Sequence, residues 1–243
     1  MLLAVDVGNT KIKAAVFKDD TLSDRFVFNA VEAVKAIENI FAKHSKITAA
    51  ILSSVGKASP ELLYTIEKNV PVTIVDHQTP VPFKTSYATP HTLGVDRIVL
   101  SAGAVLNHPA QNRLVIDAGT CITYDFIDDK DNYYGGAISP GIRLRYEALH
   151  NFTAKLPLLT REMPVSVTGN STVESIHSGV VNALIFEIQG FIDYYENKYD
   201  NLAVILTGGD AEFLAVRFKN TIFANSNFLL ESLNQLYLYT QND

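Results

Sequence analysis

Apolar residues recur along the chain in two patterns, which together predict a mixture of strands and helices. Short apolar runs bounded by turn residues predict buried strands, and these runs occupy residues 2–5, 11–17, 49–55, 70–75, 114–116, 121–127 and 202–206. Apolar residues at helical spacing predict helices over 31–42 and 60–68 and after a turn at 94–97. A longer helix is expected from Thr172, with an apolar stripe made of Ile176, Val180, Leu184, Ile188, Phe191 and Tyr195. Because strands alternate with helices, we expect an α/β fold with helix-covered sheets.

One part of this pattern occurs twice. A strand leads into an Asp-x-Gly turn that is followed by a threonine, at residues 6–10 and again at 117–120. Each turn is followed by a second strand, and each second strand ends in a polar turn. The repeat predicts two similar α/β halves, residues 1–108 and 109–243, divided where proline and polar residues cluster at 107–109.

Composition narrows the class of protein. The chain has 243 residues, of which 47% are hydrophobic and 19% charged, and this suits one large domain or two small ones. The single cysteine excludes an intramolecular disulfide and favours a cytoplasmic location. A net charge of -6 argues against nucleic acid as a partner, although not against one small anion. No apolar stretch looks long enough to cross a bilayer, so no membrane partner is expected.

The two turns carry the candidate chemistry. Glycine after a strand lets the backbone approach a phosphate, and a nearby carboxylate can hold a cation that bridges to it. Asp6 with Gly8, Asn9 and Thr10 therefore resembles one half of a metal–nucleotide site. Asp117 with Gly119 and Thr120 resembles the other half. The alternative is that both are ordinary turns, since these residue types all favour turns.

A duplicated clamp of this kind is typical of the actin-like ATPase and sugar-kinase architecture. The expected fold is accordingly an actin-like (ribonuclease H-like) duplication, with the nucleotide site between two similar α/β halves. The architecture does not by itself name a substrate.

Several further motifs make the sequence similar to one family, the type III pantothenate kinases, over essentially the whole chain. The blocks that carry the resemblance are DVGNTKIK (6–13), GVDR (94–97), DAGTCITYD (117–125), GGAISPGIRL (135–144), TVESIHSG (172–179) and TGGD (207–210). That family uses ATP to phosphorylate the terminal hydroxyl of pantothenate, the first step toward coenzyme A. One departure is visible, because residues 230–233 read Leu-Glu-Ser-Leu where the family commonly has Leu-x-Gly-Leu.

The resemblance implies a role for each matching residue. The ATP phosphates would be bound by Asp6, Val7, Gly8, Asn9, Thr10, Lys11, Ile12 and Lys13. Asp6 would hold Mg²⁺ through a water molecule, and Thr120 would also contact ATP. Pantothenate would be bound by Tyr87, Gly94, Val95, Asp96, Arg97 and Thr172, with Asp96 as the catalytic base. Asp117 would hold a monovalent cation, K⁺ or NH₄⁺. Members of the family are homodimers, and the second half would supply dimer contacts.

Several of these residues have an ordinary structural interpretation. Asp96 and Thr172 both stand where a helix N-cap is favoured. Arg97 suits the carboxylate of pantothenate, since its planar fork binds a carboxylate in two places, but it could equally form a surface ion pair. Tyr87 could be an ordinary core or surface tyrosine, and Cys121 is expected to be a small core residue of a strand.

Two segments and two rival functions also stay open. Residues 135–141 suit a loop that approaches a ligand or a tight connection after a strand, and residues 207–210 suit the adenosine end of the site or a plain turn. The first rival function is another small-molecule kinase of the same fold. The second is a non-catalytic, ligand-binding regulator of the kind first described as an accessory transcription factor.

Overall fold

The computed structural model describes residues 1–54, 58–218 and 222–242, and the chain forms two compact units. The first unit comprises Met1–Pro109, Asp131–Tyr134 and Asn227–Asp243, and the second comprises Ala110–Lys130 and Gly135–Ser226. The first boundary falls one residue after the one expected from the sequence. Unlike the expected second half, the second unit does not contain the C-terminal helix α8 (Phe228–Asn242). That helix packs against α3 (Val95–Asn107), β1 (Leu2–Val7) and β4 (Ala49–Ser54) of the first unit.

The first unit is built on a five-stranded sheet in the order β3-β2-β1-β4-β5. Its strands are β1 (Leu2–Val7), β2 (Ile12–Lys18), β3 (Thr21–Phe28), β4 (Ala49–Ser54) and β5 (Val72–Ile74). Strand β1 is central, antiparallel to β2 and parallel to β4. Val55, the last residue of one expected strand, lies outside the described residues.

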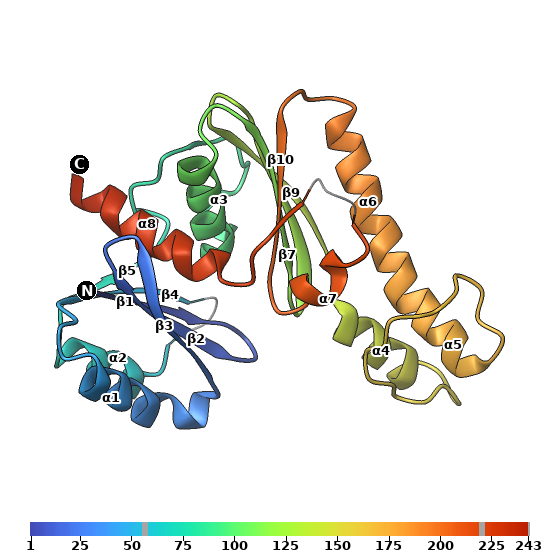
Figure 1. Cartoon of the computed structure of the whole chain (residues 1–243), viewed down its shortest axis with the longest axis horizontal. Helices are drawn as coiled ribbons and strands as arrows, with labels where there is room; N and C mark the ends of the chain where they lie inside the picture. The colour runs from blue at the N-terminus through green and yellow to red at the C-terminus, as the bar shows by residue number, and fades with distance from the viewer. Residues whose placement is uncertain (55–57, 219–221, 243) are drawn as a thin grey trace. The chain divides into compact units, whose positions relative to one another are not determined.

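Four helices cover this sheet. They are α1 (Ala33–Lys43), α2 (Pro60–Glu67), α3 (Val95–Asn107) and α8, with short 3₁₀ turns at Ala30–Glu32 and Pro90–Thr92. Helices α1 and α2 bury apolar side chains against one face of the sheet, and α3 and α8 pack on the other (Figure 1). The N-terminus of α2 is capped by Ser59, whose hydroxyl accepts a hydrogen bond from Leu62 N at 3.1 Å. Helix α1 begins later than expected, and Val31 lies in the preceding turn, 94% exposed.

The second unit repeats the strand order of the first. Its strands are β7 (Asn112–Ala118), β8 (Cys121–Ile127), β9 (Asn132–Pro140), β10 (Leu202–Thr207) and β11 (Ile222–Ala224). Read from β9, the order is β9-β8-β7-β10-β11, with β7 antiparallel to β8 and parallel to β10. The short β6 (Lys84–Thr85) pairs with Asn132 and Tyr133 at the start of β9, and all of these residues belong to the first unit. The duplication expected from the two turns is therefore confirmed at the level of strand topology.

The helices of the second unit are α4 (Ile142–Asn151), α5 (Thr172–His177), α6 (Ala183–Glu196) and α7 (Ala211–Ala215). Helices α5 and α6 are joined by a π-helical turn, Ser178–Asn182, so the long helix expected from Thr172 is confirmed. Its apolar stripe is confirmed as well, since the first four members are buried and the last two pack against the same core.

Three details of the sequence interpretation need correction. Cys121 is exposed at the first position of β8, not buried in the core. The Gly135–Pro140 segment is part of strand β9 and not a loop. The helix N-caps lie earlier than expected. Helix α3 is capped by Gly94 and not Asp96, and helix α5 is capped by Ser171 and not Thr172.

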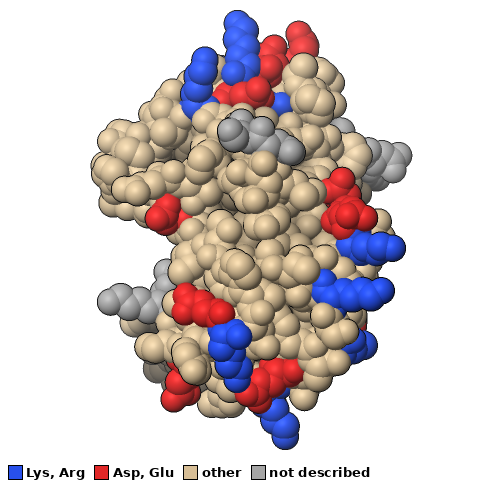
Figure 2. Space-filling view, turned by 90° about the vertical axis from the view of Figure 1, so that its left-hand side faces the viewer, with Lys and Arg blue, Asp and Glu red and all other residues tan. Residues whose placement is uncertain are grey.

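The surface carries both signs of charge. On the face shown in Figure 2, basic and acidic side chains are interspersed and most of the surface is uncharged, as the 19% charged fraction leads one to expect. None of the helices in the described ranges has the length and apolar character needed to cross a membrane.

A close approach of α3 to α8 depends on Gly103. A Cβ added there would lie 1.9 Å from Ser232 Oγ and 3.0 Å from Ser232 Cα. Ser232 Oγ is itself buried, and within the described part of the chain it has no hydrogen-bond partner. The two helices therefore meet with no space for a methyl group.

We expect Gly103→Ala to lower the free energy of unfolding by up to about 2 kcal/mol. Overpacking costs about 1–3 kcal/mol, and the better helix propensity of alanine returns about 1 kcal/mol. Urea unfolding followed by circular dichroism measures the difference.

Gly190 provides the matched control, because it is an exposed glycine of α6 with no atom within 4 Å of an added Cβ. Gly190→Ala should raise the free energy of unfolding by up to about 1 kcal/mol. Introducing Ser232→Gly into the Gly103→Ala variant should recover much of the loss, measured against Ser232→Gly alone. Equal effects of the two alanine substitutions would contradict the close packing.

Candidate active site

Asp6 lies near the end of the central strand of the first unit, and it is only 5% exposed. The register of β1 with β4 places Ser53 beside it, and the Ser53 hydroxyl donates a 2.9 Å hydrogen bond to Asp6 Oδ1. The register of β1 with β2 places Lys13 opposite. A buried carboxylate is thus supported from both neighbouring strands.

The electrostatic environment of Asp6 is unusual for a structural aspartate. Burial raises its pKa to about 6, although the Ser53 hydrogen bond and the positive charge of Lys13 act in the opposite direction. The carboxylate of Asp96 raises the pKa further, so these two acidic groups are near enough to repel each other. A bound cation would relieve both the burial and the repulsion.

The turn after Asp6 is tight, and its tip faces solvent. Gly8 N donates to Lys11 O at 3.2 Å, and a Cβ on Gly8 would lie 3.1 Å from the same oxygen. Asn9 and Thr10 are exposed at the tip, whereas Ile12 is buried in β2. Lys11 Nζ donates to Asn29 Oδ1 at 2.7 Å.

Asp96 lies in the first turn of α3, beyond the Gly94 cap. Its Oδ1 accepts a 2.9 Å hydrogen bond from Arg97 N. A Cβ on Gly94 would lie 2.4 Å from that oxygen, so the glycine leaves room for the carboxylate. Asp96 is therefore not the N-cap, and Val95 occupies the first helical position between it and the cap.

Arg97 is buried, with 5% of its surface exposed, and its guanidinium lies 5.7 Å from the centre of the Tyr87 ring. An exposed surface ion pair is thus excluded for this residue. Tyr87 in turn lies 6.1 Å from the fully buried ring of Tyr133 in β9. A cation held over an aromatic ring in this way keeps its planar donors oriented.

The second turn lies in the second unit and has different support. Asp117 pairs with Thr207 of β10 and with Thr123 of β8, and Gly119 N donates to Cys121 O at 3.0 Å. Gly208 has a φ of +98°, and a Cβ there would lie 2.4 Å from both Asp117 Oδ1 and Ala118 O. The Thr207–Asp210 segment therefore packs directly against the turn that carries Asp117 and Thr120.

Within each unit, the structure brings several of the expected site residues together. In the first unit, Asp6, Lys13 and Asp96 share an electrostatic environment, and Arg97 contacts Tyr87. In the second unit, the turn at 117–120 meets Gly208. Thr172 is an exposed first residue of α5, after the cap at Ser171.

Sequence reasoning missed two supporting residues of the first unit. Strand β4 ends in two serines, Ser53 and Ser54, after an apolar run. A polar residue at the end of a buried strand was the sequence feature that could have indicated a partner for Asp6. Tyr133 could not be recognised, because its contact with Tyr87 depends on the long-range pairing of β6 with β9.

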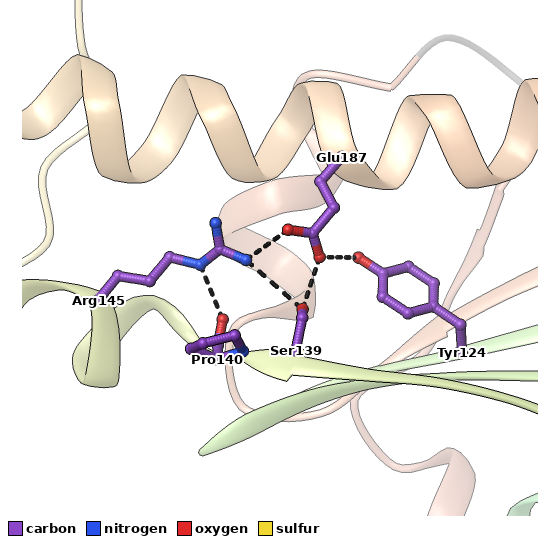
Figure 3. A network of polar contacts seen from close by, with 5 residues as sticks. All are labelled: Tyr124, Ser139, Pro140, Arg145 and Glu187. Atoms are coloured by element: carbon purple, nitrogen blue, oxygen red, sulfur yellow. Dashed lines mark hydrogen bonds and ion pairs between the residues drawn. The ribbon is translucent and has the colours of Figure 1, made fainter. Parts of the chain in front are cut away.

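A polar network in the second unit joins α6 to α4, β8 and the end of β9 (Figure 3). The Glu187 carboxylate of α6 accepts hydrogen bonds from Tyr124 Oη at 2.7 Å and Ser139 Oγ at 2.5 Å. Arg145 of α4 forms an ion pair with the other carboxylate oxygen at 2.5 Å, and its Nε donates to Pro140 O at 2.8 Å.

These contacts set the charge state of the network. Burial alone would raise the pKa of Glu187, but the hydrogen bonds from Ser139, Arg145 and Tyr124 outweigh it and hold the pKa below its usual value. Burial, together with Glu187, raises the pKa of the Tyr124 hydroxyl, which therefore remains a donor.

The fold and these two turns define a class of protein. A structure from Sinorhizobium meliloti titled "putative 2-dehydro-3-deoxygalactonokinase" superposes with a TM-score of 0.60 at 12% identity, covering 98% of this chain and 99% of that one. A ROK family glucokinase from Streptomyces griseus gives 0.50 at 12% identity, covering 97% and 98%. The chain has the duplicated actin-like fold of the sugar kinases, as expected from its sequence.

The family is narrower than that class. The model of the type III pantothenate kinase family matches residues 2–194. A type III pantothenate kinase of Flavobacterium johnsoniae is 59% identical over 98% of this chain and 98% of its own length. One from Christiangramia forsetii is 47% identical over 96% of each. The chain belongs to the type III pantothenate kinase family and is a kinase.

The charged state of Glu187 predicts a pH dependence of stability. Since the folded state lowers its pKa, ionised Glu187 stabilises the fold above the usual value of 4.5, and that contribution disappears as pH falls through the folded pKa. We expect Glu187→Gln to lower the free energy of unfolding by about 1–2 kcal/mol at pH 7. The difference from the unmodified protein should shrink as the pH is lowered toward 3.

Urea unfolding at a series of pH values measures this difference. Glu147→Gln is a suitable control, because among the described residues Glu147 has an ion pair only with Arg143, an exposed residue one helical turn away, where ion pairs contribute little. A difference for Glu187→Gln that is constant between pH 7 and pH 3 would contradict the assignment.

Proposed function

We propose that this protein transfers the γ-phosphoryl group of ATP to the terminal hydroxyl of pantothenate, giving 4'-phosphopantothenate in the first step of coenzyme A biosynthesis. The observation that carries the proposal is the grouping within one unit of Asp96, the buried Asp6 and an oriented Arg97. In this grouping, Asp96 can activate the acceptor hydroxyl, Asp6 can bind a cation, and Arg97 can bind the carboxylate of the substrate. Membership of the family supports the same substrate.

The phosphates of ATP are assigned to the turn at residues 6–13. Carboxylate donors fit Mg²⁺, which is usually held by one or two carboxylates together with water and substrate phosphates. Asp6 supplies such a donor, and the repulsion between Asp6 and Asp96 is the feature that favours a cation there. When bound, Mg²⁺ neutralises phosphate charge. Gly8, Asn9 and Thr10 at the turn, with the nearby Lys13, provide backbone and side-chain donors for the phosphate oxygens.

Asp96 is assigned as the base. A primary alcohol is a weak nucleophile, so a carboxylate within hydrogen-bond reach orients it and accepts its proton while the bond to phosphorus forms and the bond to the ADP oxygen breaks. Arg97 binds the carboxylate of pantothenate through its planar fork, with Tyr87 beside it. Gly94, Val95 and Thr172 complete the proposed contacts.

Asp117 and Thr120 are assigned to a monovalent cation and to ATP. Asp117 is only partly buried. Its Oδ1 and the backbone oxygen of Ala118 both face Gly208, since an added Cβ there would lie 2.4 Å from each. Oxygen donors of this kind suit a hard cation such as K⁺ or NH₄⁺.

We also propose a homodimer. Helix α6 exposes Phe186 and Tyr194, at 58% and 57%, and both line a hollow of about 400 Å³ together with Gly190. Exposed aromatic side chains around a hollow are typical of association surfaces. Sedimentation of a monomer at micromolar concentration would contradict this proposal.

We expect Asp96→Asn to lower kcat by about 10²- to 10⁴-fold, since it removes the proton acceptor, while Mg–ATP binding weakens far less, because Asp6 still supplies a carboxylate donor for the cation. ADP release measured with and without pantothenate gives the rate, and calorimetric titration with a non-hydrolysable ATP analogue gives the affinity.

Asp24→Asn is the matched control, because Asp24 lies on β3 of the same unit and pairs with Lys43 and His44. It should turn over at the unmodified rate. Wild-type turnover by folded Asp96→Asn would remove Asp96 from the mechanism, and pantothenate-independent ADP release would overturn the substrate.

The cation assignment predicts a salt dependence. Turnover should be several-fold faster in KCl than in NaCl at equal ionic strength, and Asp117→Asn should abolish that difference. Initial rates over a series of K⁺ concentrations test this, and indifference of the unmodified enzyme to K⁺ would refute the assignment without affecting the proposed reaction.

A further inference from the structure

The turn that carries Asp117 and Thr120 rests on Gly141. Gly141 N donates to Thr120 O at 3.0 Å. A Cβ on Gly141 would lie 2.1 Å from Gly119 O and 2.5 Å from Thr120 O, so backbone packs directly on backbone. Any shift of Gly141 would therefore be transmitted to the turn.

Gly141 is held in place by Arg145. The preceding residue, Pro140, ends strand β9, and its carbonyl oxygen accepts a 2.8 Å hydrogen bond from Arg145 Nε. The same guanidinium reaches Glu187 through its Nη2 at 2.5 Å, which fixes the plane in which Nε points at Pro140 (Figure 3). The side chain of Arg145 is 19% exposed, so water screens this pair only partly.

Glu187 is itself firmly anchored. Its second carboxylate oxygen accepts hydrogen bonds from Ser139 of β9 and Tyr124 of β8, and the Tyr124 ring is stacked on Phe191 of α6 at 3.9 Å. On the same helix, Leu184 and Ile188 are buried in the core of the unit. The carboxylate thus connects a rigid helix to the end of the strand that supports the turn.

We propose that Arg145, oriented by Glu187, is a positioning residue that holds the Asp117–Thr120 turn in the conformation that binds ATP. Arg145 acts through Pro140 and Gly141 and does not itself contact substrate. The inference rests on the proposed function for the assignment of Thr120 to ATP. The residues assigned to the carboxylate of pantothenate, Tyr87 and Arg97, belong to the other unit. Loss of the positioning contact should therefore weaken ATP binding selectively.

Arg145→Lys tests this selectively, because lysine keeps the positive charge for Glu187, but its donors all lie on one nitrogen and cannot reproduce the fork that reaches Glu187 and Pro140 from two nitrogens. We expect KM for ATP and the Kd for a Mg-bound non-hydrolysable analogue to rise about tenfold. KM for pantothenate should stay within about twofold, and the melting temperature should change little. Glu187→Gln leaves the Arg145–Pro140 bond but loosens the guanidinium, and it should give a smaller rise in KM for ATP.

Arg143→Lys is the matched control. Arg143 lies on the same helix, its side chain is 64% exposed, and its only described ion pair is with Glu147 at 3.1 Å. All four quantities should match those of the unmodified enzyme.

The outcomes separate the two proposals. If Arg145→Lys and Glu187→Gln leave KM for ATP unchanged, or raise both KM values together, the positioning role is overturned while pantothenate phosphorylation stands. If the unmodified protein shows no pantothenate-dependent turnover but binds the analogue, and Arg145→Lys weakens that binding about tenfold, the substrate is wrong and the positioning role stands. Folded, unmodified protein that does not bind the analogue overturns both.

Discussion

The first unit depends on the burial of one carboxylate. An ionised aspartate removed from water is costly unless neighbouring groups compensate, and Asp6 obtains this compensation from β4 through Ser53 and from β2 through Lys13. Both contacts require β1 to be the central strand, with one parallel and one antiparallel neighbour. Its pKa of about 6 shows that the compensation is incomplete. This remaining deficit supports the proposal that a cation binds at the end of this strand.

The second unit has the same strand order but supports its carboxylate differently. Asp117 is less deeply buried than Asp6, and its turn is held by close backbone contacts from Gly208 and Gly141. The duplication therefore preserves topology while the chemistry has diverged. A turn held by side-chain charges and a turn held by backbone contacts suit different tasks, in line with the proposed assignment of a divalent cation to the first turn and a monovalent cation to the second.

Local features were predictable from the sequence, and long-range pairings were not. The two hairpins and the apolar stripe of the long helix follow from residue periodicity, which acts over a few positions. The partners of Asp6 and Tyr87 depend on strand register between segments far apart in the chain, and no local signal specifies a register. Cys121 was wrongly expected in the core, because the first residue of a hairpin strand can lie at the solvent-exposed edge. The return of α8 to the first unit likewise depends on packing and not on its own sequence.

The contact between Gly103 and Ser232 shows how the structure accommodates the serine at position 232, where the sequence departs from the family pattern. The family commonly has glycine where this chain has Ser232, and in this chain the residue without a side chain at the contact is Gly103 of α3. The contact has space for a side chain on one of the two helices but not on both. Relatives with glycine in α8 are therefore free to carry a side chain at the position of Gly103, and the two sites should covary as a compensated pair.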